Sequence, residues 1–231
     1  MGSEIPYFIP LNDAVEISRT RKIDLQSETI SLDKAHRRIL SKPLHSLTND
    51  PPFDNSAMDG FAVIYSETLN PPTILKVSTT VEAGNKFDNI INPGEAARIM
   101  TGAPIPKGAD SIIPIELCEF DNENNTVKLI QESKPHFIRK KGENFSLNEK
   151  LLSKGTYLTP EKISLCAAMG YGEVDVFKPL KVAVIPTGDE LKLPGEELES
   201  GQIFESNTFG ISSLISWLGH EPIRYPSVID S

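Results

Sequence analysis

Cysteine is scarce in this sequence of 231 residues, which contains only Cys118 and Cys166. The two cysteines lie far apart and outside any CxxC pattern, which argues against a disulfide framework and favours a reducing compartment. Long apolar runs are also lacking. The first apolar stretch, residues 5–11, is interrupted by prolines and follows no basic residues, so we expect neither a signal peptide nor a membrane span. The sequence therefore predicts a cytoplasmic protein without a membrane partner.

An excess of positive charge is missing as well, because 32 Asp and Glu residues outnumber 23 Lys and Arg residues. A surface that neutralises phosphate backbones is usually basic, so nucleic acid is not an expected partner. Neither GxGxxG nor the P-loop pattern occurs, which disfavours a generic nucleotide or phosphosugar binder. The four histidines show no metal-ligand spacing.

What remains is the composition of an ordinary globular protein, with 39% hydrophobic and 24% charged residues. Apolar residues at helical spacing predict helices over residues 11–23 and 31–40, and a third helix begins at Thr159 and ends at Gly170. Between these helical parts, short runs such as TILKVSTTV, AARIM, SIIPIE and TVKLIQ alternate with turn residues and predict strands.

Helical segments on both sides of a β-rich block predict that the block is inserted into a helical domain. We therefore expect a helical dimerisation domain formed by residues 1–44 and 145–178, with an inserted β-rich domain over residues 45–144.

From Lys181 onward the pattern changes to a βαβ unit. The run VAVI reads as a buried parallel strand, PTGDEL as a polar connection, and Ser206-Asn207 leads a helix. One such unit covers too little of a parallel sheet, so residues 179–231 are expected to be the start of an incomplete α/β domain. The predicted fold class is thus multidomain α/β plus β.

The stretch PPFDNSAMDGFAV, residues 51–63, gathers polar residues around one methionine. A structural interpretation lets Asp54 cap a helical turn over residues 55–59, with Gly60 ending it in the left-handed conformation and Met58 in the core. A functional interpretation makes the acids part of a site. This window alone leaves both interpretations open.

Three other stretches are ambiguous in the same way. In PTGDEL, residues 187–190 follow a parallel strand, where open α/β sheets bind ligands, although a solvated loop is an equal alternative. RIMTGAPIPKGAD, residues 98–110, is a rigid turn-rich loop that suits either binding or a plain hairpin connection. RKKGEN, residues 139–144, could receive a phosphate or remain a solvated basic patch.

Taken together, DNSAMDGFAV, RIMTGAPIPKGAD, RKKGEN, and VAVIPTGDELKLPGE followed by GQIFESN resemble the molybdopterin molybdenumtransferases, the family that includes the gephyrin E domain. The resemblance implies insertion of molybdenum from molybdate into molybdopterin, with adenylylated molybdopterin as substrate and a divalent metal such as Mg²⁺. It also implies a homodimer in which the β-rich domain of one subunit faces the α/β domain of the other.

Matching the motifs position by position implies three catalytic residues, Asp59, Thr101 and Glu190, of which Asp59 and Glu190 would bind the metal. The substrate-binding residues that the resemblance implies are Asn55, Ser56, Gly188, Asp189, Asn207 and Arg139. Asp230 lies near a further aspartate of the family.

The sequence also departs from the family pattern. Asn144 stands where the family often has aspartate, and a GGVS loop, a PGNP-like loop and a C-terminal β domain are not present. We therefore expect a part of a longer protein that lacks some of the site and is inactive alone. The alternative is a non-catalytic dimerising scaffold of the gephyrin type.

Overall fold

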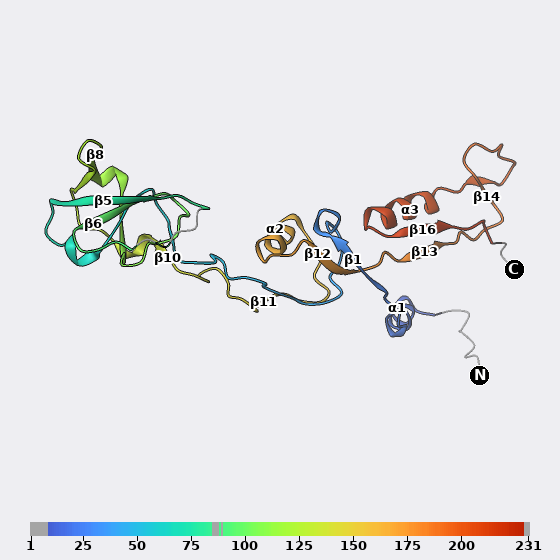
Figure 1. Cartoon of the computed structure of the whole chain (residues 1–231). Helices are drawn as coiled ribbons and strands as arrows, with labels where there is room; N and C mark the ends of the chain where they lie inside the picture. The colour runs from blue at the N-terminus through green and yellow to red at the C-terminus, as the bar shows by residue number, and fades with distance from the viewer. Residues whose placement is uncertain (1–8, 85–87, 89, 229–231) are drawn as a thin grey trace. The chain divides into compact units, whose positions relative to one another are not determined.

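A computed structural model describes residues 9–84, 88 and 90–228 (Figure 1). The chain forms two compact units, here called the terminal and the central unit. The terminal unit consists of Met1–Lys42, Lys154–Ile163 and Glu173–Ser231, and the central unit of Pro43–Ser153 and Ser164–Gly172. Both helices and strands occur, which confirms a mixed α and β class, although strands dominate.

A six-stranded mixed sheet in the order β7-β4-β6-β5-β9-β8 forms the body of the central unit (Figure 1). Its strands are β4 (Gly60–Val63), β5 (Thr73–Val81), β6 (Glu95–Ile99), β7 (Ser111–Pro114), β8 (Cys118–Asp121) and β9 (Thr126–Leu129). Only the β5–β6 pair is parallel among the strand pairs described in this sheet. The strand predicted from TILKVSTTV is confirmed over its whole length.

All four residues of strand β4 are buried. Successive side chains point to opposite faces of a strand, so β4 is covered on both faces. Phe61 and Val63 join one apolar cluster. Ala62 joins a second cluster on the opposite face, together with Ile99. The position of β4 is therefore fixed from both sides, which also fixes the residue before it, Asp59.

The structural interpretation of residues 55–59 as a helical turn is wrong. Residues Asn55–Ser56 form strand β3, and Gly60 is the first residue of β4 rather than a left-handed helix end. A Cβ atom on Gly60 would lie 2.1 Å from the carbonyl oxygen of Ile113. Glycine is thus required here for a close approach of two strands, not for a positive φ.

The central unit also contains short elements outside the sheet. Strand β3 pairs with β10 (Ile138–Arg139), and β2 (Leu44–His45) pairs with β11 (Lys150–Leu152), both antiparallel. The 3-10 turns are η2 (Tyr65–Glu67), η3 (Ile115–Leu117) and η4 (Pro135–Phe137).

In the terminal unit, helix α1 (Leu11–Thr20) is followed by β1 (Ser27–Ser31), which pairs antiparallel with β12 (Glu173–Phe177). This pair joins residues from the two flanks of the β-rich block. The segments that were expected to be helical thus also contain strands, and the boundaries of the three domains stay a prediction.

The helix expected over residues 31–40 is wrong. A single 3-10 turn, η1 (Leu32–Lys34), follows β1, and Leu40 then donates its backbone N–H to Thr156 O at 2.9 Å. Leu40 is fully buried. Pairing with a distant segment has outweighed the helical spacing of the apolar residues.

Helix α2 (Pro160–Ala168) confirms the helix expected after Thr159. The βαβ unit is also confirmed, since β13 (Lys181–Val184) pairs parallel with β16 (Glu221–Arg224) and α3 (Asn207–Trp217) connects them (Figure 1). Two short strands, β14 (Leu191–Lys192) and β15 (Ile203–Phe204), pair within the connection. Among the described residues, no helix is long and apolar enough to cross a membrane.

We predict that Gly60→Ala destabilises the protein by at least about 2 kcal/mol, because the new methyl group would overlap the Ile113 carbonyl. Urea unfolding measures the difference. Gly172→Ala is the matched control, since no atom lies within 4 Å of the new Cβ, and its stability should change by less than about 0.5 kcal/mol. Equal stability of the two variants would contradict the close approach at Gly60.

Candidate functional site

Three segments of the central unit meet at strand β3. Ser56 donates its backbone N–H to Ala103 O at 3.0 Å and accepts a hydrogen bond from Gly102 N at 2.8 Å. On the other edge, Asn55 pairs with Arg139 of β10. The DNSAMDG, MTGAP and RKKGEN stretches, which are far apart in the sequence, are therefore neighbours in space.

The hydroxyl of Ser56 serves the local turn. It donates to Met58 O at 2.6 Å and also lies 3.3 Å from Met58 N. Ser56 is almost completely buried. Its expected role in substrate binding stays a prediction, and its visible role is to shape the turn that leads to Asp59.

Asp59 and Thr101 come together because their strands are neighbours. Gly60 of β4 pairs with Ile99 of β6, so the residue before one strand meets the loop after the other. Oδ1 of Asp59 accepts hydrogen bonds from Thr101 N at 2.6 Å and from Thr101 Oγ1 at 2.7 Å. Two of the three expected catalytic residues are thus in direct contact.

The Asp59 carboxyl is ionised at neutral pH. The hydrogen bonds from the backbone and then the side chain of Thr101, helped by the positive charge of Arg98, hold the pKa of Asp59 below its usual value. Asp59 is exposed to solvent. A hydroxyl has one proton, and that of Thr101 goes to Asp59, so Thr101 orients the carboxylate in this structure.

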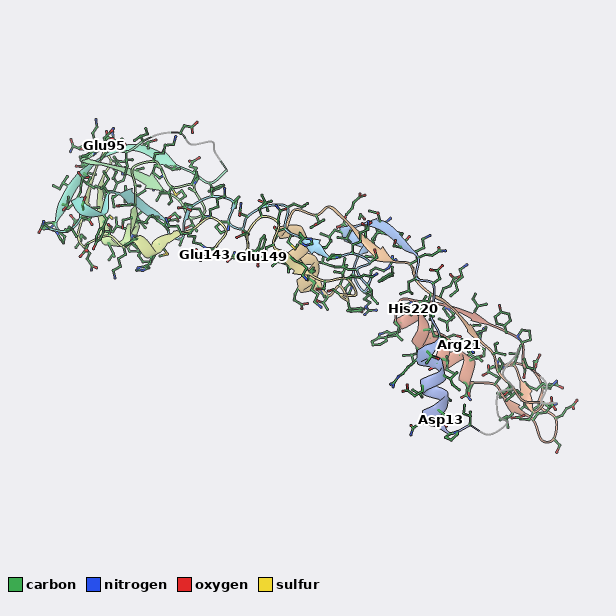
Figure 2. The ribbon with its side chains drawn as sticks, turned by 90° about the horizontal axis from the view of Figure 1, so that it is seen from below. Asp13, Arg21, Glu95, Glu143, Glu149 and His220 are labelled. Carbon is green, nitrogen blue, oxygen red and sulfur yellow. The ribbon has the colours of Figure 1, made fainter. Side chains whose placement is uncertain are left out.

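The basic RKKGEN loop is largely neutralised by neighbouring acids. Lys140 forms an ion pair with Asp54 at 2.9 Å, and the same carboxylate accepts the backbone N–H of Lys141 at 2.8 Å. The contact with Lys141 and then that with Lys140 lower the pKa of Asp54. Glu143, labelled in Figure 2, accepts a hydrogen bond from the Lys140 N–H at 3.0 Å. This arrangement favours a structural loop over a phosphate-binding one.

The side-chain amide of Asn144 both accepts and donates a hydrogen bond. It accepts a hydrogen bond from the Arg139 guanidinium at 3.0 Å and donates one to the Asp50 carboxylate at 2.8 Å. An aspartate at this position could not donate to Asp50. The hydrogen bond to Asp50, an acid 94 residues earlier in the sequence, therefore explains why asparagine occupies this position.

In the terminal unit, the TGDEL stretch follows β13, at the edge of the parallel pair where open α/β sheets bind ligands. Asp189 and Glu190 are exposed. Gly188 has a φ of 137°, and a Cβ there would lie 2.5 Å from Oε2 of Glu190. Glycine thus leaves room for the Glu190 carboxylate to fold back over the turn. Asp230 lies outside the described residues.

A cavity of about 500 Å³ lies at the carboxyl ends of β13 and β16. Its lining consists of Pro186, Leu191, Lys192, Leu193, Glu196, Glu205, Thr208, Arg224, Tyr225, Pro226 and Ser227. The expected residue Asn207 begins α3, between two of these lining residues. Glu205, in the stretch GQIFESN, is a residue that sequence reasoning missed.

The donor set fits a divalent metal only in part. No group of three or more His, Cys, Asp or Glu side chains within residues 9–84, 88 and 90–228 could hold a metal ion. Mg²⁺ is often held by one or two carboxylates together with substrate phosphates and water. Both contacts from Thr101 go to Oδ1 of Asp59, so Oδ2 is available as one such donor.

Comparison with known proteins gives a consistent picture. The family model described as the MoeA N-terminal region, domains I and II, matches residues 9–170. A molybdopterin molybdenumtransferase from Haemophilus influenzae is 40% identical over 199 residues, which is 86% of this chain and 49% of the relative. A protein of the same name from a Nostoc species is 36% identical over 217 residues, or 91% of this chain and 49% of the relative.

Two crystal structures of a molybdopterin biosynthesis MoeA protein from Pyrococcus horikoshii are also similar. The first matches with a TM-score of 0.83 at 34% identity and covers 96% of this chain and 58% of its own. The second matches with a TM-score of 0.86 at 30% identity and covers 96% of this chain and 60% of its own. The chain spans about half the length of the curated relatives it matches.

We predict that Thr101→Val raises the pKa of the Asp59 carboxyl, because the variant loses the hydroxyl donor. The pKa should stay below its usual value, since the backbone N–H, the larger cause, remains. A carbon-detected NMR titration of the Asp59 carboxyl measures it, and Asp54 serves as internal control because its partners are unchanged. An unaltered Asp59 titration in a folded variant would contradict this role of Thr101.

Proposed function

The chain belongs to the family of the MoeA N-terminal region, and from this membership we propose that it takes part in molybdenum cofactor synthesis, as part of a protein that inserts molybdenum from molybdate into molybdopterin. The observation that carries the proposal is the family match over residues 9–170. The contact between Asp59 and Thr101 supports it, because two residues that the resemblance marks as catalytic form one hydrogen-bonded pair.

The substrate in this proposal is adenylylated molybdopterin, whose adenylate is released as molybdenum enters. Molybdate and a pyrophosphate-linked pterin are both anionic and repel each other. A carboxylate with a lowered pKa is a poor general acid at neutral pH but a good oxygen ligand. Asp59 is therefore proposed as a ligand of Mg²⁺, which would supply the positive charge that offsets the repulsion.

Glu190 is proposed as the second carboxylate for the same cation. Its position after β13 supports this role, since the polar residues beyond a parallel strand are those that reach a bound ligand. Asp59 belongs to the central unit and Glu190 to the terminal unit. In our proposal the two acids that share one cation come from different subunits of a homodimer.

Helix α1 supports the homodimer. None of its residues is buried, and Leu11, Val15 and Ile17 are exposed at 78%, 37% and 44%. A helix with an apolar side normally buries it against another element, and a second subunit would supply one. A dimeric scaffold without catalysis is the alternative function, and the experiment below separates the two.

The test uses a chimera that continues this sequence with the second half of the Haemophilus influenzae relative, since the chain covers half of that relative. Asp59→Asn and Glu190→Gln should each lower molybdenum insertion by roughly 10²-fold or more. Both variants keep the size of the side chain. In Asp59→Asn the amide oxygen could still accept the hydrogen bonds of Thr101, so the variant removes the charge and keeps the contact.

Mixing the two inactive variants should restore activity, because each mixed dimer contains one intact site. Random exchange of subunits gives half mixed dimers, so about a quarter of the wild-type activity is expected if the two substitutions act independently. Co-purification of an untagged variant with a tagged one shows independently that subunits exchange. A mixture that exchanges subunits and stays inactive would show that the two acids do not act across the dimer, and an inactive wild-type chimera would favour the scaffold.

A further inference from the structure

Arg98, a half-buried residue of strand β6, has a guanidinium group without a hydrogen-bond partner. Its Nε is buried and unpaired. The part of the chain that the structure describes gives the two terminal nitrogens no hydrogen bond and no ion pair either. Lys128 of the same unit, by contrast, is paired with Glu119 at 2.8 Å. Buried polar groups are normally paired, so the unused donors of Arg98 call for an explanation.

The register of the sheet places Arg98 near Asp59. Gly60 pairs with Ile99 and Phe61 pairs with Arg98, so Arg98 lies beside the start of β4, which Asp59 directly precedes. The positive charge of Arg98 acts on the Asp59 carboxyl, although the hydrogen bonds to that carboxyl come from Thr101. A cation and a carboxylate are thus neighbours, and each keeps hydrogen-bonding capacity for a ligand.

Packing orients the Arg98 side chain without using its donors. The guanidinium carbon lies 5.7 Å from the ring centre of Phe120, and the rings of Phe120 and Phe61 lie 5.6 Å apart. On the other side, Arg98 pairs with Thr80 of β5, which is exposed and uncharged. A cation above an aromatic ring is attracted by the face of the ring and keeps its N–H groups for other partners.

The ligand that suits such a group is a tetrahedral oxyanion. The planar guanidinium presents N–H donors in a fork that matches two oxygens of a phosphoryl group. We propose that Arg98 binds the pyrophosphate group of the substrate, next to Asp59. This assignment rests on the function proposed above, which supplies the pyrophosphate. Molybdate has the same tetrahedral shape, so the experiment must distinguish the two anions.

The test is an NMR titration of the 231-residue chain with inorganic pyrophosphate or with molybdate, at constant ionic strength and without Mg²⁺. The resonances of the Arg98 Nε–H and the Thr101 backbone N–H report binding. Pyrophosphate should shift both resonances. It should also bind at least about threefold more tightly than molybdate, because it carries more negative charge and more acceptor oxygens.

Arg98→Gln should weaken pyrophosphate binding at least about tenfold, since it removes both the charge and the fork of donors. Arg98→Lys should weaken binding at least about threefold, because lysine keeps the charge and the apolar stem but lacks the planar fork. Lys128→Gln is the matched control, since it removes one charge that is already paired with Glu119. This control should bind pyrophosphate within about twofold of wild type.

Asp59→Asn tests where the anion binds. Without Mg²⁺ the Asp59 carboxylate repels a neighbouring anion, so this variant should bind pyrophosphate about twofold more tightly or better. The Thr101 backbone N–H reports binding in all variants, and thermal unfolding shows whether each variant keeps its fold.

Four results would overturn the proposal: no shift with pyrophosphate, tighter binding of molybdate than of pyrophosphate, equal binding by Arg98→Gln and Lys128→Gln, or weaker binding by Asp59→Asn. The first two need no variant, so an unfolded variant would not protect the proposal. The titrations involve neither Mg²⁺ nor turnover. Their failure would therefore remove the role of Arg98 and leave the proposed insertion reaction to its own assay.

Discussion

The candidate site of the central unit depends on two hydrogen bonds that Thr101 donates to one oxygen of Asp59. They lower the pKa of an exposed carboxyl and hold it in one orientation, with its second oxygen available to a ligand. The rest of the sheet makes them possible. Strand β4 is packed from both faces, Gly60 allows it to approach β7 closely, and the pairing of Gly60 with Ile99 sets the register that brings both residues together.

The terminal unit provides a different kind of chemistry. Its parallel strand pair ends in a turn with an exposed acid, Glu190, and in a cavity that contains a buried acid, Glu205. An exposed carboxylate is suited to a cation, whereas a buried and ionised one is suited to N–H donors.

Elements with a strong local pattern could be predicted from the sequence. The β-branched run of β5 and the helices α2 and α3 are examples. The helix expected over residues 31–40 failed because Leu40 is held by Thr156, a partner that no local pattern reveals. The charge balance of the RKKGEN loop could not be predicted for the same reason, since Asp54 lies 86 residues before Lys140. The residues Asp59 and Thr101 were predictable through the family motifs, but their contact required the register of β4 and β6.

Insertion of molybdenum is the central claim, and the product of a single turnover tests it most directly. The chimera would be supplied with adenylylated molybdopterin, molybdate and Mg²⁺, and both the released adenylate and the molybdenum bound to the pterin would be quantified. Our account predicts that both products form together in equal amounts. Release of adenylate without molybdenum in the cofactor, or a folded dimer that yields neither product, would contradict it.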